Sequence, residues 1–270
     1  MRGSLRARLA GLAIAAALAG WFIGPAPAAA NQARLDYVGY IAGAPVLDLS
    51  ASITVPGGVK PRDGAYAVSA EIATIGNLAV LYPYSQSVQA TGALAAGAPR
   101  PARYQSTIRV WNRQEAVTLT YAPNGTVAIN AVPLTRQAQM AQQQGYAHGT
   151  MDPASLVVAV ATSFAHAGRC QGQHPVFDGA RRYDLAFQQG GYADLDPLQN
   201  SYYAGSATEC TATPELVAGF QQSALNASLY PQSARLWMAP AIAGFPPVPV
   251  RIFARSAFGE VTLELVNVAR

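Results

Sequence analysis

The stretch VLDLSASITV, from Val46 to Val55, alternates apolar and polar side chains along almost its whole length. The apolar residues fall on one side of an extended chain and the polar residues on the other, in the order Leu47, Leu49, Ala51, Ile53 and Val55 against Asp48, Ser50, Ser52 and Thr54. Because successive side chains of a β-strand point to opposite faces, this period of two predicts a strand with one buried face.

Segments on both sides of this strand carry the same signal. The preceding segment LDYVGYIAGAP (35–45) has the β-prone residues of a partner strand, with a turn at Gly43–Pro45. Asn124–Gly125 stands between two β-prone runs and predicts a hairpin, because both positions of the tightest turns need positive φ angles. Further strands are predicted at 65–74, 102–112, 115–122, 248–258 and 260–268, the last two joined near Phe258–Gly259.

One segment predicts an α-helix, at 152–167. Asp152 can cap its first turn, Pro153 suits the next position, and Gly168 can end it, while apolar residues recur every four positions at Leu156, Val160 and Phe164. The Gln-rich segment 136–150 is weakly patterned and predicts a mobile loop or a frayed helix. The expected architecture is a long, curved antiparallel sheet, wound as a β-spiral or open barrel, with the helix packed on it.

The first thirty residues form a separate unit. Three arginines in the first eight residues precede the apolar run 9–23, and Ala28–Ala30 supplies small residues for cleavage before Asn31. These features predict a secretory signal peptide at 1–30 and export to the periplasm. The alternative is a retained membrane anchor, against which the helix-breaking Pro25 and Pro27 argue. Contact with the membrane is expected only through such an uncleaved segment.

Removal of the signal peptide changes the charge of the protein. The segment carries three of the eighteen Lys and Arg residues and no acidic residue, which leaves fifteen basic against fourteen acidic residues, a formal charge of +1. Such a balance gives no support for binding to nucleic acid, which would require a basic patch. The remaining 31–270 show no linker and no fixed repeat, so we expect a single domain.

Two cysteines in an exported chain most simply form one disulfide, between Cys170 and Cys210, because the compartment is oxidising. The alternative is a redox-active or nucleophilic thiol. No Cys-x-x-Cys motif is present to lower the pKa of a thiol, so we interpret the pair as structural.

Motifs of common enzymes are missing from the sequence. It contains no nucleophile elbow, no zinc-binding His-Glu-x-x-His, no P-loop and no dinucleotide fingerprint, and only three histidines. His166 lies near the end of the predicted helix, where it can act as a capping or surface residue. His148, His174 and Asp152 could meet at a metal ion, but they lack ligand spacing. We therefore expect no catalytic set, no metal and no cofactor.

The densest cluster of ionisable residues is HPVFDGARRYDL (174–185). Asp178–Gly179 after Phe177 predicts a tight hairpin turn, with Tyr183, Leu185 and Phe187 facing inward and Arg182, Asp184 and Ala186 facing solvent. A pair of catalytic carboxylates would need Asp178 and Asp184 to converge on one substrate, which this register does not favour. We interpret the motif as a structural hairpin.

The order of these motifs resembles the exported proteobacterial family known as domain of unknown function 3108. The resemblance rests on LDYVGYIAG (35–43), DPASL (152–156), VFDGARRYDL (176–185) and YAGSATECTATPELVAGF (203–220), and on FPPVPVRIFARSAFGEVTLEL (245–265) near the end. It implies a periplasmic β-spiral, similar to envelope proteins of the EipB type, and adds weight to the bond between Cys170 and Cys210. It implies no catalytic residue.

Two functions remain open at this level. The first is a non-enzymatic periplasmic protein that supports the cell envelope by binding a partner protein or a lipid-like, amphipathic ligand in an apolar groove of the open sheet. The second is an envelope hydrolase that uses His174 or His148 with a nearby carboxylate. The apolar residues, 51% of the chain, could also simply fill a core.

Overall fold

The computed structural model describes residues 30–197, 200–223, 230–256 and 259–270. The predicted signal peptide lies outside these residues apart from Ala30, with which the first strand begins. Within this part of the chain, no helix is both long and apolar enough to cross a membrane.

The described residues form one antiparallel sheet of thirteen strands with the order β7-β6-β5-β4-β3-β2-β1-β13-β12-β11-β10-β9-β8. The strands are β1 (Ala30–Ile41), β2 (Ala44–Pro56), β3 (Gly64–Thr74), β4 (Tyr84–Ala95), β5 (Ala98–Val110), β6 (Arg113–Tyr121), β7 (Val127–Val132), β8 (Gln171–Phe177), β9 (Arg182–Leu195), β10 (Gly205–Ala218), β11 (Ala234–Ala239), β12 (Val248–Ser256) and β13 (Gly259–Ala269). The helices are α1 (Gly76–Leu81), α2 (Arg136–Gln144) and α3 (Pro153–Ala167).

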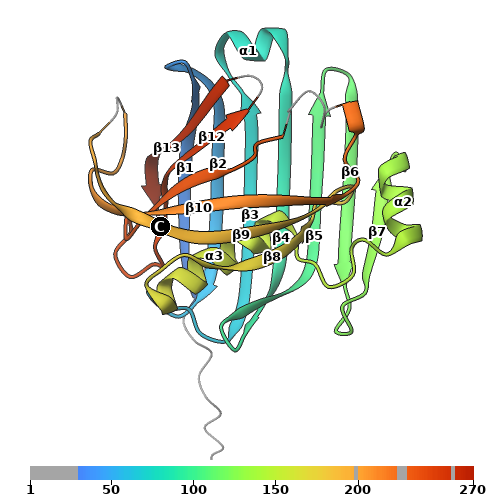
Figure 1. The fold of residues 1–270 in the computed structure, drawn as a ribbon, viewed down its shortest axis with the longest axis horizontal. Helices are drawn as coiled ribbons and strands as arrows, with labels where there is room; N and C mark the ends of the chain where they lie inside the picture. Colours follow the sequence, from blue (N-terminus) through green and yellow to red (C-terminus); the bar gives the residue numbers. More distant parts are fainter. Residues whose placement is uncertain (1–29, 198–199, 224–229, 257–258) are drawn as a thin grey trace, which may run out of the picture.

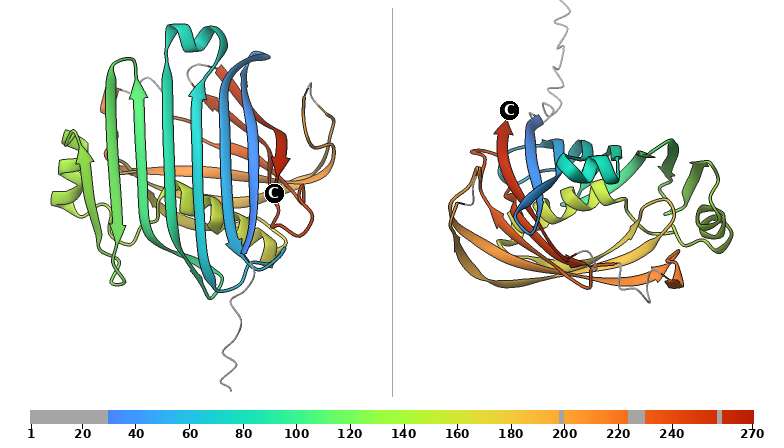
Figure 2. Two further views of the ribbon diagram at one scale, coloured as in Figure 1. Left: turned by 180° about the vertical axis from the view of Figure 1, so that it is seen from behind. Right: turned by 90° about the horizontal axis from the view of Figure 1, so that it is seen from above.

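The sheet winds into an open barrel, as expected, and its edges are β7 and β8. Strands β1–β7 form one broad wall, the later strands cross in front of it, and α3 lies between the two layers (Figures 1 and 2). Helix α3 contacts β3, β4 and β5 on one side and β8 on the other. The helix therefore fills one end of the space that the sheet encloses.

Strand pairing follows the alternation seen in the sequence. Ala51 pairs with Ala70 and Ile53 with Val68, so the apolar faces of β2 and β3 coincide. The turn before β2 differs from the prediction. It consists of Ala42 and Gly43, both with positive φ, rather than Gly43–Pro45, because β2 already begins at Ala44.

The predicted helix at 152–167 is confirmed as α3. The Asp152 side chain accepts a hydrogen bond from the Ser155 backbone N–H at 2.8 Å, and the helix ends at Gly168 with a left-handed backbone. In the Gln-rich segment, Thr135 caps α2, so this part is a helix rather than a loop. Helix α1 was not predicted, and none of its residues is buried.

The disulfide between Cys170 and Cys210 is present, with 5.7 Å between the two Cα atoms. It joins the segment after α3 to β10, and both cysteines pack with Phe164 and Met238 in a small apolar cluster. The bond therefore fastens the end of α3 to the second layer of the sheet.

Candidate functional site

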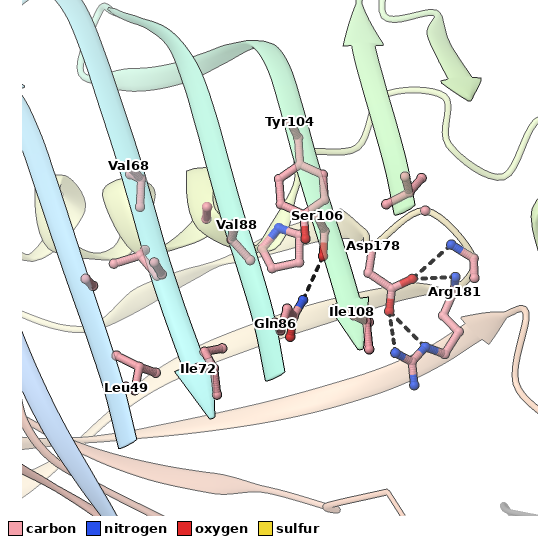
Figure 3. Close-up of a pocket in the computed structure, with 18 of the residues that line it drawn as sticks. Leu49, Val68, Ile72, Gln86, Val88, Tyr104, Ser106, Ile108, Asp178 and Arg181 are labelled. Carbon is pink, nitrogen blue, oxygen red and sulfur yellow. Dashed lines mark hydrogen bonds and ion pairs between the residues drawn. The ribbon is translucent and has the colours of Figure 1, made fainter. Parts of the chain in front are cut away.

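A cavity of about 690 Å³ lies on the concave face of the sheet. Its walls include the inner faces of β1–β6, residues of β7 and the start of α2, one side of α3, the turn between β8 and β9, and residues of β12 and β13. Figure 3 shows part of this lining. This volume falls in the range of about 300–1,000 Å³ that is typical of small-molecule sites.

The side chains on the inner face of the wall are buried near α3 and become more exposed further along the strands. Near α3, Ile53 and Val68 are buried, at 5% exposure each. Two residues further along the same strands, Ala51 and Ala70 are only half-buried although they line the cavity. Still further along β2, β3 and β5, the cavity-lining residues Leu49, Ile72 and Ile108 are likewise half-buried. Among the described residues, nothing therefore fully covers this apolar surface.

Helix α3 contributes a second apolar wall. Its residues Ala154, Val158 and Ala161 line the cavity together with Val157, whose side chain is 41% exposed. An apolar side chain on an inner helix is ordinarily covered. Val157 faces the cavity instead, so the exposed surface of the wall is continued on the helix.

Polar side chains gather at the β4–β5 side of the cavity. The Gln86 side-chain amide donates to the Ser106 hydroxyl at 2.9 Å, and the Tyr84 hydroxyl donates to the Gln86 carbonyl at 2.6 Å. Figure 3 shows Gln86 and Ser106 between the apolar residues of the wall and the turn that carries Asp178 and Arg181. The cavity is thus amphipathic, with uncharged amide and hydroxyl groups at its polar end.

The turn between β8 and β9 forms the rim of this polar end. The Asp178 carboxylate accepts hydrogen bonds from the backbone N–H groups of Ala180 and Arg181, at 3.0 and 2.8 Å. It also pairs with the Arg181 guanidinium at 2.8 Å. Burial acts to lower the pKa of Arg181, but the Asp178 carboxylate outweighs it and the pKa is raised. The charges of this pair are therefore largely satisfied within the turn.

Gly179 allows the turn to pack against the wall. Its φ is +108°, and a Cβ at this position would lie 2.6 Å from a methyl carbon of Val117 on β6. Any larger residue would strain the backbone and push the turn away from β6. The turn bridges the two layers of the sheet through this contact.

The predicted geometry of the hairpin needs two corrections. The turn has four residues, Asp178–Arg181, because Phe177 pairs with Arg182. The charges do not all face solvent, since Asp178 and Arg181 line the cavity and the pair Arg182–Asp184, at 3.4 Å, is half-buried. The prediction of which side chains face solvent used the alternation along β9 alone. The packing of the turn against β6 instead decides which of its residues line the cavity.

A buried polar network closes the other end of the space. The Ser155 hydroxyl donates to the Asp152 carboxylate at 2.6 Å and lies 2.7 Å from the Tyr66 hydroxyl oxygen. Burial raises the pKa of Asp152, although the hydrogen bonds from Ser155 oppose this shift. Burial and the nearby Asp152 carboxyl also raise the pKa of Tyr121. This network anchors the start of α3 on β3.

The three histidines occupy separate places. The His166 ring nitrogen lies 2.8 Å from the Pro61 carbonyl oxygen, which ties the end of α3 to the loop before β3. His148 lies against Gly125 in the β6–β7 turn. His174 packs edge-on against Phe187 with its Nε2 unpartnered, and burial lowers its pKa. No metal-binding group of three or more His, Cys, Asp or Glu exists among the described residues, so the site weighed from His148, His174 and Asp152 is not formed there.

Gln86 and Ser106 were not singled out from the sequence. Both stand at inward positions of their strands, where the alternation predicts apolar residues. A polar residue at an inward position is an exception to the alternation, and this exception could have identified them. It becomes apparent once the pairing of Val88 with Ser106 fixes which residues of β4 and β5 face inward.

Comparisons with known proteins agree with this fold. The model of the family described as "Protein of unknown function (DUF3108)" matches residues 36–266. The search of curated proteins finds no match. A solved structure, a β-barrel-like protein of domain of unknown function DUF1849 from Brucella abortus, is similar with a TM-score of 0.50 and 10% identity, over 90% of this chain and 98% of that chain. At this identity, the likeness shows the fold alone.

Proposed function

This chain belongs to the DUF3108 family of proteins of unknown function, and we propose that it is a non-enzymatic periplasmic protein that supports the cell envelope by binding an amphipathic ligand in its cavity. The observation that carries the proposal is the half-buried apolar wall formed by Leu49, Ala70 and Ile72, which lines the cavity together with the exposed Val157. Covering such a surface with an acyl chain is favourable by roughly 25 cal/mol for each Å² removed from water. The signal peptide predicted from the sequence at 1–30 supports the periplasmic location.

The size of the cavity favours a single-chain ligand. A methylene group takes up about as much space as a water molecule, roughly 30 Å³, so a cavity of this size accepts about twenty heavy atoms. That number corresponds to one acyl chain with a small polar head. A lipid with two long chains would leave much of its apolar surface outside.

The polar end favours an uncharged head. Among the described residues that line the cavity, only Glu115, Asp178 and Arg181 are charged, and Arg181 is already paired with Asp178. Gln86 and Ser106 offer amide and hydroxyl groups instead. An anionic head would have to displace Asp178 from Arg181 and approach Glu115, which is electrostatically costly. We therefore infer a ligand with hydroxyl or amide groups, such as a monoacylglycerol.

The test compares two tryptophan variants on adjacent positions of β3. Ala70→Trp fills the cavity, whereas Ser69→Trp places the same side chain on the exposed outer face. We expect monopalmitoylglycerol to bind the wild-type protein and Ser69→Trp with a ratio of one to one in native mass spectrometry. Ala70→Trp should weaken this binding by at least about tenfold, because its side chain occupies the space of the acyl chain.

Palmitate and palmitoyl-lysophosphatidylglycerol serve as charged probes, and we expect both to bind more weakly than monopalmitoylglycerol. Equal binding to the two tryptophan variants would overturn the cavity as the site. Binding of none of the amphiphiles, together with a co-purifying protein that Ala70→Trp does not release, would favour a protein partner instead. Circular dichroism of both variants checks that the sheet is intact.

A further inference from the structure

Large apolar side chains are exposed together beside the mouth of the cavity. Val80 and Leu81 of α1 are 82% and 75% exposed, Tyr82 after the helix is 42% exposed, and Trp111 in the β5–β6 turn is 61% exposed. We call these four residues the apolar tip. The Tyr82 and Trp111 rings meet edge to face with 5.1 Å between their centroids, so the two segments form one surface.

The tip is held rigidly rather than packed away. The Ile75 N–H donates to the Val46 carbonyl at 3.0 Å, and the Thr74 hydroxyl donates to the Tyr82 carbonyl at 2.9 Å. The Trp111 N–H donates to the Pro83 carbonyl at 3.2 Å, which joins the two turns. None of the residues of α1 is buried. These bonds present the apolar side chains of the helix to the outside, and α1 projects beyond the end of the sheet (Figure 1).

Trp111 has a backbone conformation that a bulky residue rarely adopts. Its φ is +49°, in the left-handed region that glycine or asparagine occupies at lower cost. Apart from its edge-to-face contact with Tyr82, most of this side chain is exposed, so packing in the monomer offsets little of the backbone strain. This combination favours a role for the side chain outside the folded domain.

Charge indicates what the tip contacts. Segments 75–83 and 109–114 contain no acidic residue and two exposed basic residues, Arg109 and Arg113, beside Trp111. Trp and Tyr are enriched at the interface between a bilayer and water, and basic residues next to them are attracted to anionic lipid heads. A protein partner would be expected to offer hydrogen bonds to a polar rim. The nearest exposed carboxylates, Asp48, Glu71 and Glu115, lie on the strands behind these two segments rather than within them. Apolar side chains with arginines as their immediate charged neighbours fit an anionic lipid surface better.

The tip is continuous with the cavity. Tyr84 lines the cavity, donates to Gln86 and stacks on Tyr82 with 6.4 Å between ring centroids. The half-buried ends of the apolar rows, Leu49 and Ile72, lie at the same end of the strands, where α1 connects β3 to β4. Any external surface that binds the apolar tip therefore also lies next to the open end of the cavity.

We propose that the apolar tip inserts into the interfacial layer of a membrane that contains anionic lipids. Val80, Leu81 and Trp111 enter the layer, while Arg109 and Arg113 contact lipid phosphates. This contact goes beyond the binding of a ligand in the cavity and does not depend on it. It also adds a second membrane contact to the one that the sequence suggested for an uncleaved N-terminal segment.

Flotation with vesicles tests the proposal. The probe is phosphatidylcholine vesicles with 30 mol% phosphatidylglycerol, added to full-chain protein recovered from cells, so that residues 1–29 are the same in every variant. Val80→Asp/Leu81→Asp should reduce binding by at least about tenfold, because two charges enter the site of insertion. Arg109→Gln/Arg113→Gln should reduce it by roughly fivefold per arginine and remove its dependence on phosphatidylglycerol.

The matched control is Val132→Asp/Leu134→Asp, which places the same charges on side chains that are 63% and 54% exposed near β7. It should leave vesicle binding unchanged. Tryptophan emission, taken as the difference between wild type and Trp111→Phe, should shift to the blue with vesicles. Equal binding of the tip and control variants, or an emission from Trp111 that does not shift, would overturn the proposal. Binding of monopalmitoylglycerol in solution should be the same in wild type and the tip variant, which separates this test from that of the cavity.

Discussion

The two ends of the concave face are formed by the same strands, but only one of them is covered by the helix α3. At the α3 end, the apolar rows are covered by the helix, and the buried polar groups Asp152, Ser155 and Tyr66 are bonded to one another. At the α1 end, the same rows reach Leu49 and Ile72, which the described residues cover only in part, and the connecting helix exposes its own apolar residues. The first end is removed from water by folding, whereas the second is left partly exposed by the described residues and is the surface that the proposed ligand would cover.

Because the two ends differ in burial, we expect one end of the sheet to contribute mainly to stability and the other mainly to ligand binding. Buried apolar contacts and the hydrogen bonds of Asp152, Ser155 and Tyr66 contribute to the free energy of unfolding, and these lie at the covered end. A half-buried apolar wall contributes less to folding, but it provides binding energy to a ligand. Substitutions at the covered end should therefore act on stability, and substitutions at the open end should act on binding.

The largest effect is expected from removal of the disulfide. Cys170 and Cys210 are 40 residues apart, and opening a loop of this length returns chain entropy to the unfolded state worth about 4 kcal/mol in the usual treatment. Urea denaturation of Cys170→Ala/Cys210→Ala should show this loss, while the folded fraction still binds monopalmitoylglycerol. A loss below about 1 kcal/mol would mean that the bond does not hold the covered end together.

A pair of identical substitutions compares the two ends directly. Leu119→Ala empties a fully buried site, at 0% exposure, and should lower the free energy of unfolding by about 3 kcal/mol. Leu49→Ala acts on the open wall, where Leu49 is already half-buried beside the cavity, and should cost about 1 kcal/mol. Thermal or urea denaturation measures both. Equal losses would show that the cavity is filled by protein in solution and would break the comparison.

Asp152 gives the covered end a pH dependence of known sign. Because burial raises its pKa above the usual 3.8, the folded state holds this proton more tightly than the unfolded state does. The protonated carboxyl therefore stabilises the fold most below pH 3.8, and this contribution is lost as the pH rises through the raised pKa. Asp152→Asn keeps a helix cap and cannot titrate, so relative to wild type it should be least stable in acid and should improve toward neutral pH.

The measurement is urea denaturation of Asp152→Asn and wild type at several pH values from 3.5 to 7. Asp152→Ala, which also loses the cap, should be about 1–2 kcal/mol less stable than Asp152→Asn at every pH. A difference between wild type and Asp152→Asn that stays constant with pH would contradict the raised pKa.

Much of this fold follows from local patterns. The alternation in Val46–Val55 predicts a strand with one buried face, and the pairing of Ile53 with Val68 confirms it. Asp152 and Gly168 mark the ends of α3 because capping is decided by a few neighbouring residues. Helix α1 gave no such signal, since it is six residues long, lacks a side-chain cap and buries nothing. Its position depends on backbone bonds to a distant strand.

The cavity could be predicted only in outline. An apolar face at period two has the same sequence whether a helix covers it, as at Val68, or leaves it open, as at Ile72. The motif around Asp178 was correctly identified as a hairpin, but its charges were placed in solvent. The contact of Gly179 with Val117 of β6, some sixty residues earlier in the chain, turns Arg181 toward the cavity instead. Such non-local contacts are not encoded in the local pattern.

The smallest effect is expected at the polar end of the cavity and makes the comparison most precise. Gln86→Leu keeps an inward side chain of similar size but removes the amide that bonds Ser106 and Tyr84. The free energy of unfolding should change by less than about 1 kcal/mol, because the Ser106 hydroxyl can turn to water or to another acceptor. The affinity for monopalmitoylglycerol should fall by about tenfold, since the glycerol head loses a hydrogen-bonding partner, while the affinity for palmitate should change less. Isothermal titration calorimetry with both probes distinguishes this outcome from a general loss of binding. A Gln86→Leu variant that binds both probes equally weakly would show that Gln86 shapes the wall rather than recognises the head.

Gln86→Glu provides the control. It keeps the size of the side chain but places a charge where this part of the cavity lining otherwise offers uncharged groups.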